Sequence, residues 1–319
     1  MNRYWPLLLL GLALASCQGP RPAREAAVLD ARPLPAARPI SLTTPPRYVL
    51  SIYGVDHPLD VAVAPDGTRL YVSEGGGERQ VRIFDRDGQL LGTLAPPGTE
   101  PSERMPVYLS VAPNGQVYVS DRLAHQLYVF DPKGRLLRTI SPPARSGPWS
   151  PLGVHLDQRG QLLVTDLAAA PHQVQVYDQS GRYLRSLGAE LAPPLAFPNG
   201  VTTDGRGRIY VADGNNRRVL VWAEGAAPVI LGGLGLPRGL AVDSQQRLYV
   251  ADALAHQVLV YAVSGEPRPL FAFGHEGFGD GEFRFPNGVA VDRLNQVYVV
   301  DRENQRVQVW TYEGGEEGS

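Results

Sequence analysis

The sequence predicts an all-β fold, a six-bladed β-propeller of four-stranded antiparallel blades, from three observations. A sequence repeat that predicts three short strands occurs six times along the chain. Turn-forming segments such as PDG, PNG and DGRG separate the strands. The last copy stops before a fourth strand, whereas a strand that belongs to no copy, RYVLSIYG at Arg47 to Gly54, precedes the first copy.

Each copy begins at a proline that opens its first strand, at Pro58, Pro106, Pro151, Pro198, Pro237 and Pro286. Second and third strands rich in Val, Ile, Leu and Tyr follow at nearly constant spacing. Copies one to three continue into a clear fourth strand, and copies four and five carry the weaker equivalents APVILGG and PRPLFAFG. One such sheet has two apolar faces that it cannot bury alone, so the sheets are expected to stack around an axis.

The unmatched strand before the first copy resembles the fourth strands RLLRTI and RYLRSLG of copies two and three. We therefore expect Arg47 to Gly54 to complete the sixth blade, beside the strands that end at Trp310. Closing the ring in this way leaves no open seam between its two ends.

Composition is consistent with a globular protein and excludes several classes of site. The 319 residues are 43% hydrophobic and carry a formal net charge of -2, which gives no support for a nucleic-acid partner. The single cysteine, Cys17, excludes an intramolecular disulfide and a zinc cluster built on cysteines.

The N-terminus predicts export. Arg3 is followed by the apolar run WPLLLLGLALAS, which is shorter than the roughly 20 residues of a membrane-spanning helix and suits a signal peptide over residues 1–16. The segment LASC, Leu14 to Cys17, resembles a bacterial lipobox. That resemblance implies acylation of Cys17 after cleavage and, with Gln18 next, the outer membrane in a Gram-negative cell. The alternative is an ordinary secretory signal with an incidental cysteine.

Residues 17–46 are rich in proline and alanine and show no periodicity, so they are expected to form a semi-extended tether behind the lipidated cysteine. The propeller is expected over residues 47–312, followed by a disordered tail over 313–319. This organisation places a lipid-anchored domain at the bacterial cell envelope.

The phrases PNGVAVD…VYVVD…NQRVQVW and PNGVTTD…IYVAD…NNRRVLVW resemble NHL repeats. The resemblance recurs six times over nearly all of residues 47–312 and implies the propeller fold. NHL propellers serve as docking surfaces for protein or RNA and, in relatives, as enzymes, and the fold does not choose among these functions.

The longer and more varied connections, between second and third strands and between blades, are expected on one face, called here the top face. Binding residues usually lie on such loops. The residue after each opening proline is expected near the channel mouth on this face. This residue is apolar in the first three blades and polar in the last three; the six are Leu59, Val107, Leu152, Asn199, Arg238 and Asn287. This split favours a pocket for an anionic or carbonyl-bearing ligand. The alternative is that PNG and PRG only start turns, with Arg238 paired to a nearby acid.

Acidic residues end all six second strands, at Glu74, Asp121, Asp166, Asp213, Asp252 and Asp301. We interpret them as acceptors of backbone N–H groups in their own top loops rather than as a ring that holds a cation. Tyrosines also recur in register, at Tyr71, Tyr118, Tyr210, Tyr249 and Tyr298. They are expected to pack between blades, with their hydroxyl groups bonded locally.

His155 stands in a first strand where the other copies carry small residues, so it is either a channel group or, by preference, a satisfied core residue. His125, His172 and His256 occupy matching loop positions in separate blades. That placement suits solvated surface better than zinc binding.

Two enzyme alternatives remain beside the binding module. A gluconolactonase-like hydrolase would hold a divalent cation at the channel mouth with Asn199 and Asp60, but Arg238 replaces an expected acid and opposes a cation. A lyase of the peptide-amidating type would need zinc-binding histidines, which are not convincingly placed. We therefore expect a binding or scaffold module without catalytic residues, metal or cofactor. Its predicted ligand-binding residues are Asn199, Arg238, Asn287, Asp60 and His155, and its partner is an unidentified protein or small molecule.

Overall fold

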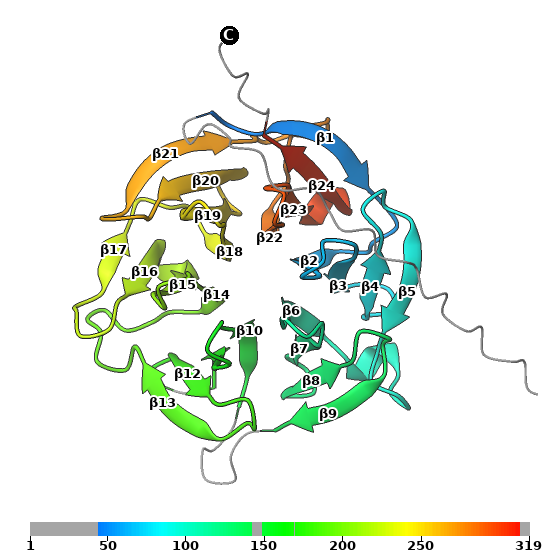
Figure 1. Ribbon diagram of the computed structural model, residues 1–319, viewed down its shortest axis with the longest axis horizontal. Coiled ribbons are helices and arrows are strands. Elements are labelled where there is room, and N and C mark those ends of the chain that lie inside the picture. The colour runs from blue at the N-terminus through cyan, green and yellow to red at the C-terminus, as the bar shows by residue number, and fades with distance from the viewer. Residues whose placement is uncertain (1–43, 142–148, 169, 313–319) are drawn as a thin grey trace, which may run out of the picture. The chain divides into compact units, whose positions relative to one another are not determined.

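The computed structural model describes residues 44–141, 149–168 and 170–312. These residues form six four-stranded antiparallel sheets arranged around one axis, with the first strand of each copy innermost (Figure 1). The predicted fold class is confirmed. No helix in the described ranges is long and apolar enough to cross a membrane.

The six blades share one strand order, from the axis outward. The innermost strands are β2 (Pro58–Val63), β6 (Pro106–Val111), β10 (Pro151–Leu156), β14 (Pro198–Thr203), β18 (Pro237–Val242) and β22 (Pro286–Val291). The second strands are β3 (Leu70–Glu74), β7 (Val117–Asp121), β11 (Leu162–Asp166), β15 (Ile209–Asp213), β19 (Arg247–Asp252) and β23 (Val297–Asp301).

The third strands are β4 (Val81–Phe84), β8 (Gln126–Phe130), β12 (Gln173–Tyr177), β16 (Arg218–Trp222), β20 (Gln257–Ala262) and β24 (Arg306–Thr311). The outer strands are β5 (Leu90–Leu94), β9 (Leu136–Ile140), β13 (Tyr183–Leu187), β17 (Val229–Leu231), β21 (Arg268–Phe273) and β1 (Arg47–Ile52). The weak fourth strands expected in copies four and five are therefore present as β17 and β21.

The N-terminal strand closes the ring as predicted. Strand β1 pairs antiparallel with β24, so that Arg47 lies opposite Thr311 and Ile52 opposite Val307. The Tyr48 ring packs edge-on against Trp310 with centroids 6.1 Å apart. The sixth blade is thus built from both ends of the described chain.

The core lies between neighbouring blades. Second strands are buried along their whole length, and one apolar cluster fills each interface between blades. The interface between the sixth and first blades contains Ile52, Val61 and Val309 from three different strands. The recurrent tyrosines take part as predicted; the hydroxyl of Tyr210, for example, donates to Asp204 at 3.0 Å.

The innermost strands approach one another too closely for side chains at their third position. A Cβ atom added at Gly200 would lie 2.5 Å from the carbonyl oxygen of Arg238, and one added at Gly239 would lie 2.5 Å from that of Asn287. Four blades carry glycine at this position, and the other two carry Asp60 and Tyr108. These two side chains therefore lie where most blades have none.

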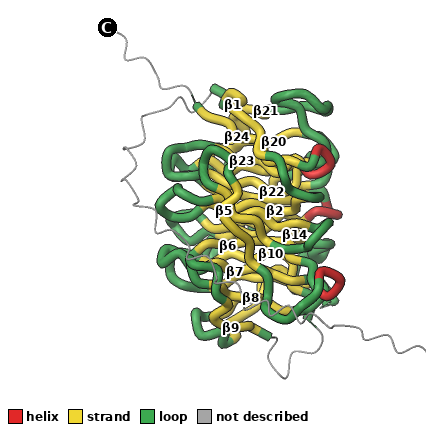
Figure 2. Tube along the Cα trace, turned by 90° about the vertical axis from the view of Figure 1, so that its right-hand side faces the viewer, coloured by secondary structure: helices red, strands yellow, loops and turns green. Residues whose placement is uncertain are grey.

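The loops expected on the top face do lie on one side of the ring. Pro58 pairs with Glu74 and Pro286 with Asp301, so the starts of first strands and the ends of second strands share one edge. The short 3₁₀ helices η1 (Pro101–Glu103), η2 (Gly214–Asn216) and η3 (Arg302–Asn304) lie on this same side (Figure 2).

The predicted signal peptide (1–16), Cys17, all but the last residues of the tether (17–46) and the tail (313–319) lie outside the described residues. They remain predictions.

Candidate functional site

Six buried carboxylates organise the loops of the top face. Each accepts a backbone N–H from the segment that enters its own first strand, at 2.7 to 3.0 Å; the donors are Asp56, Met105, Ser150, Ala196, Leu236 and Arg284. Asp121 also accepts the N–H groups of Leu123 and Ala124 in the loop that follows it. The interpretation of these acids as loop acceptors is confirmed.

Three of these acids are also paired with an arginine from the third strand. The Nε–H groups of Arg82, Arg218 and Arg306 donate to Glu74, Asp213 and Asp301 at 2.5, 2.7 and 2.7 Å. Because all three carboxylates are fully buried, each of these pairs ties the second strand to the third and supports the loop between them.

The polar residues predicted at the channel mouth form hydrogen bonds to neighbouring blades. Asn199 is fully buried; its Nδ2 donates to the carbonyl of Phe197, and its Oδ1 accepts from Arg238 Nη1 at 3.0 Å. Asn287 Nδ2 donates to the carbonyl of Leu59 in the first blade. Arg238 is half-buried and forms no ion pair within the described part of the chain. The alternative in which an acid neutralises Arg238 is therefore wrong for these residues.

Asp60 is buried between the first strands of two neighbouring blades. Its Oδ2 accepts the Leu109 N–H at 2.9 Å, and its Oδ1 lies against Gly288. Burial raises the pKa of Asp60 to about 8, with the hydrogen bonds from Leu109 and Val61 acting in the opposite direction. The side chain is therefore mostly protonated near neutral pH.

His155 is bonded within the ring of first strands. Its Nε2 lies 3.0 Å from Thr203 Oγ1 of the next blade. Removal from water lowers the pKa of His155 to about 4, so the imidazole is neutral near pH 7. The expectation of a satisfied core histidine agrees with this partner.

Tyr108 was missed as a site residue by sequence reasoning. It is 4% exposed and its hydroxyl has no hydrogen-bond partner in the described residues. Burial is the largest effect on the Tyr108 hydroxyl and raises its pKa. The positive charge of Arg238 acts in the opposite direction, and the charge of Asp60 acts in the same direction as burial. The signal was available in the sequence, because Tyr108 stands where four other copies have glycine.

A divalent cation does not fit these residues. The oxygen of Asn199 that would face a cation already accepts from the guanidinium of Arg238, and Asp60 holds a backbone N–H. A fixed positive charge at this position opposes a second cation. Within the described ranges, no group of three His, Cys, Asp or Glu side chains is placed to hold a metal ion.

Two histidines expected on the solvated surface instead join neighbouring blades. His172 Nδ1 accepts the N–H of Phe197 at 3.0 Å, and His256 Nδ1 accepts that of Phe285 at 3.3 Å. In both cases the next blade begins Phe-Pro-Asn-Gly, and the phenylalanine has positive φ. Because of these contacts His172 and His256 are half-buried rather than fully exposed, whereas His125 is exposed as expected.

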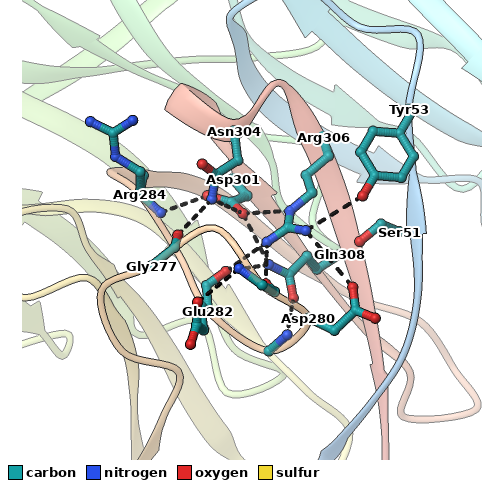
Figure 3. A network of polar contacts seen from close by, with 12 residues as sticks. Ser51, Tyr53, Gly277, Asp280, Glu282, Arg284, Asp301, Asn304, Arg306 and Gln308 are labelled. Carbon is teal, nitrogen blue, oxygen red and sulfur yellow. Dashed lines mark hydrogen bonds and ion pairs between the residues drawn. The ribbon is translucent and has the colours of Figure 1, made fainter.

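The loop of residues 274–285 connects the fifth and sixth blades, and hydrogen bonds from the side chain of Arg306 hold it in place (Figure 3). One arm of this guanidinium, Nη2, donates to the carbonyls of Gly279 and Glu282 at 2.6 and 2.9 Å, while Nε donates to Asp301. Asn304 Nδ2 donates to the carbonyl of Gly277 at 2.9 Å. The loop is therefore held in one conformation by side chains from the blade beneath it.

This loop displays an aromatic ring to solvent. Phe278 is 74% exposed and lies over the guanidinium of Arg284, 4.6 Å from ring centroid to Cζ. Tyr53, 60% exposed, stands across an open groove of about 550 Å³, and its hydroxyl lies 3.5 Å from Arg306 Nη1. The groove is also lined by Gly54, Val55, Glu303, Asn304, Gln305 and Arg306. We call it the Tyr53–Phe278 groove.

The comparisons with known proteins agree with this architecture. The NHL repeat model matches residues 195–222, 234–261 and 283–310, which fall in the last three blades. No curated protein shows significant sequence similarity to the chain.

Similar solved structures include a streptogramin B lyase, with 11% identity, a TM-score of 0.62 and coverage of 84% of this chain and 98% of that one. A virginiamycin B lyase from Staphylococcus aureus has 15% identity and a TM-score of 0.58, over 83% and 98% of the two chains. A protein of unknown function from Bacteroides thetaiotaomicron has 13% identity and a TM-score of 0.65, over 84% and 72%. Identities this low show a common fold alone. The chain is therefore a six-bladed β-propeller that carries NHL repeats.

Proposed function

We propose that this protein is a binding module that docks a protein partner on its top face, at the Tyr53–Phe278 groove. The observation that carries the proposal is the rigid display of Phe278. An aromatic ring normally packs against the rest of the protein and so removes its surface from water. Here the hydrogen bonds from Arg306 hold the loop in a conformation that leaves the Phe278 ring exposed.

The chemistry of the groove favours a protein as the occupant. Aromatic and arginine side chains dominate the binding energy of protein interfaces. Tyr53 and Phe278 supply two exposed aromatic rings, and the guanidinium of Arg284 stacks on the Phe278 ring. Because the supporting loop is ordered before binding, little conformational entropy is lost when the partner arrives.

A site-specific cross-linking experiment tests the docking proposal. A photoreactive residue at position 278 in the full chain is expected to capture one partner in cells, and the same residue at position 183 is not. With that partner purified, Phe278→Ala and Tyr53→Ala are each expected to weaken binding by about tenfold or more, as for central interface aromatics.

Tyr183→Ala is the matched control, because Tyr183 is also an exposed tyrosine, 45% exposed, but lies on the outer strand β13 of the third blade. Its substitution is expected to leave the dissociation constant within about twofold. Equal losses at positions 183 and 278, or no loss at position 278, would contradict docking at the groove.

We further propose that the module is exported and anchored at the bacterial cell envelope through Cys17. The lipobox-like LASC and the proline-rich segment behind it support this assignment. The tether would let the top face reach a partner near the membrane.

Fractionation tests the anchor. The wild-type chain is expected in the membrane fraction and in the detergent phase after temperature-induced phase separation, because an acyl chain adds apolar surface. Cys17→Ser is expected to move the protein to the soluble exported fraction, whereas Ser16→Ala, at a neighbouring small residue, is expected to change nothing. Unchanged partitioning of Cys17→Ser would eliminate lipidation.

A further inference from the structure

A second groove of the top face lies where the fourth blade meets the fifth, and we call it the Asp252 groove. It has a volume of about 420 Å³ and is lined by Asp252, the last residue of β19. Asp252 is 1% exposed and accepts backbone N–H groups, among them those of Gly235 and Leu236 at 2.7 Å. Among the residues that the structure describes, no arginine or lysine forms an ion pair with it.

The equivalent acids of the other blades have partners that Asp252 lacks. Side chains of the third strands donate hydrogen bonds to four of these acids, and the donors are Arg82, Gln175, Arg218 and Arg306. Asp121 shares a cavity of only about 10 Å³ with the buried Arg104. Asp252 therefore has no side-chain donor in the described part of the chain, and the space beside it is open.

The fourth and sixth blades show which side chains normally fill this space. In the fourth copy, Asn216 and Arg218 stand three and five positions after Asp213, and both donate to its Oδ2, at 2.8 and 2.7 Å. Asp301 receives the same two kinds of hydrogen bond in the sixth copy.

The fifth copy carries Ala255 and Gln257 at these two positions, and both line the groove. The strand register is unchanged, since Gln257 lies opposite Asp252 as Arg218 lies opposite its own acid. Alanine has no side-chain donor, and glutamine is shorter than arginine and uncharged. The Asp252 groove thus lies where the two neighbouring blades hold a buried arginine.

Those arginines bond an acid and a loop at the same time. Besides its bond to the acid, Arg218 donates through Nη2 to the carbonyl of Pro193 at 2.7 Å, in the loop that enters its blade. Arg306 forms the corresponding bonds in the sixth blade. In the fifth blade the entering loop lines the groove through Gly233 and Gly235. A guanidinium in the groove can therefore reach both an acid and a loop.

We propose that the Asp252 groove binds the guanidinium of an arginine side chain presented by a protein partner. The guanidinium pairs with Asp252, whose Oδ2 accepts one backbone N–H from Gly235 and keeps a free lone pair. Its second edge donates to a carbonyl of the loop that enters the fifth blade. Leu254, which is 54% exposed and lines the groove, contacts the methylene stem of the arginine and the partner surface around it.

The charge of the groove selects a cation, because a buried carboxylate is costly without a paired charge. Arg217 also lines the groove, but it does not supply that charge. Its side chain is exposed, and its Nε donates to the carbonyl of Leu234 at 2.9 Å.

Chemical-shift titration of the full chain with Nα-acetyl-arginine methylamide tests the site. Saturable shifts are expected, with a dissociation constant in about the millimolar range for a ligand of this size. The citrulline analogue, which has the same shape and no charge, is expected to bind about tenfold more weakly or not at all. The lysine analogue is expected to bind about threefold more weakly, because an ammonium lacks the planar fork. Free arginine is expected to bind no more tightly than the blocked form.

Asp252→Asn is expected to weaken binding of the blocked arginine by about tenfold or more, since it removes the charge that pairs with the guanidinium. Asp166→Asn is the matched control. Asp166 is 2% exposed and ends the second strand of the third blade, where Gln175 Nε2 donates to it at 2.9 Å. Its substitution is expected to leave the dissociation constant within about twofold of wild type.

A variant that fills the groove separates loss of binding from loss of folding. Ala255→Asn combined with Gln257→Arg restores the pattern of the fourth and sixth copies and leaves Asp252 in place. It is expected to weaken binding of the blocked arginine by about tenfold or more, because its own guanidinium occupies the acid. Its midpoint of urea unfolding is expected to be no lower than that of the wild type.

Absence of saturable binding of the blocked arginine to the wild type would overturn the proposal. Wild-type affinity in Asp252→Asn or in the filled variant would do the same, as would equal binding of the citrulline analogue. Free arginine that binds about tenfold more tightly than the blocked form would replace the protein partner with a small metabolite. None of these outcomes bears on the Tyr53–Phe278 groove, because that groove is tested with different variants and a purified partner.

Discussion

Replacing Ile52 with aspartate is expected to unfold most of the propeller, whereas the same replacement at Val49 is expected to be tolerated. Both residues lie in β1, but Ile52 is 2% exposed within the cluster between the sixth and first blades and Val49 is 41% exposed. Truncating a buried isoleucine costs about 2–5 kcal/mol, and an unpaired buried carboxylate adds several more. The sum approaches the total stability of an ordinary domain, about 5–15 kcal/mol.

Urea unfolding followed by tryptophan fluorescence and circular dichroism measures both variants. The Val49→Asp variant controls for the loss of strand propensity and for the added charge, and it is expected to unfold within about 1 kcal/mol of wild type. Equal, small effects at both positions would mean that β1 adds little to the sixth blade, and the ring closure would then be dispensable for stability.

Replacing Asp60 with asparagine is expected to change how stability depends on pH. The pKa of Asp60 is 3.8 in the unfolded chain and about 8 in the folded one, because burial disfavours its charged form. Between these values the unfolded chain releases a proton that the folded chain keeps, so the free energy of unfolding falls as pH rises. The slope approaches about 1.36 kcal/mol per pH unit.

His155 acts in the opposite direction at lower pH. Burial lowers its pKa from 6.5 to about 4, so its contribution to the free energy of unfolding increases as pH rises toward 6.5. Below pH 6.5, Asp60 and His155 change the free energy of unfolding in opposite directions as pH rises. Of these two residues, only Asp60 still contributes above pH 6.5. Wild-type protein is therefore expected to lose about 2 kcal/mol between pH 6.5 and pH 8.

In Asp60→Asn this loss of unfolding free energy between pH 6.5 and pH 8 is expected to disappear. Below pH 6.5 the free energy of unfolding is expected to increase visibly as pH rises, because of His155. Chemical unfolding at several pH values measures both trends. Asp178→Asn is the control, since Asp178 is exposed and hydrogen bonds from Ser180 and Arg182 lower its pKa to about 2, below the range studied. A loss between pH 6.5 and pH 8 that persists in Asp60→Asn would show that another group carries it.

The repeats and the ring closure could be read from the sequence because they depend on local pattern. Turn residues at nearly constant spacing bound each strand, and the alternation of apolar residues marks its faces. The resemblance of RYVLSIYG to other fourth strands was sufficient to place β1 beside β24. The acids that end second strands were also predictable, because their partners lie in the same blade or in the loop that enters it.

The candidate sites depended on contacts between blades and were only partly predictable. Asn199, Arg238 and Asn287 were identified by position, but their hydrogen bonds cross from one blade to the next. Tyr108 was missed although it stands where four other copies have glycine, and Phe278 was missed because it lies in a loop outside the strand pattern. The hydrogen bonds of His172 and His256 were not predicted, because they cross to the following blade.

The sequence alone determined the number of blades, their strand order and the origin of the strand that completes the sixth, because each depends on periodicity within a copy. Only the tertiary structure decided which donors are left unused near the axis and which ring faces solvent. Those properties arise when residues more than two hundred positions apart, such as Asn287 and Leu59, are brought into hydrogen-bond contact by ring closure. No spacing rule within one repeat contains that information.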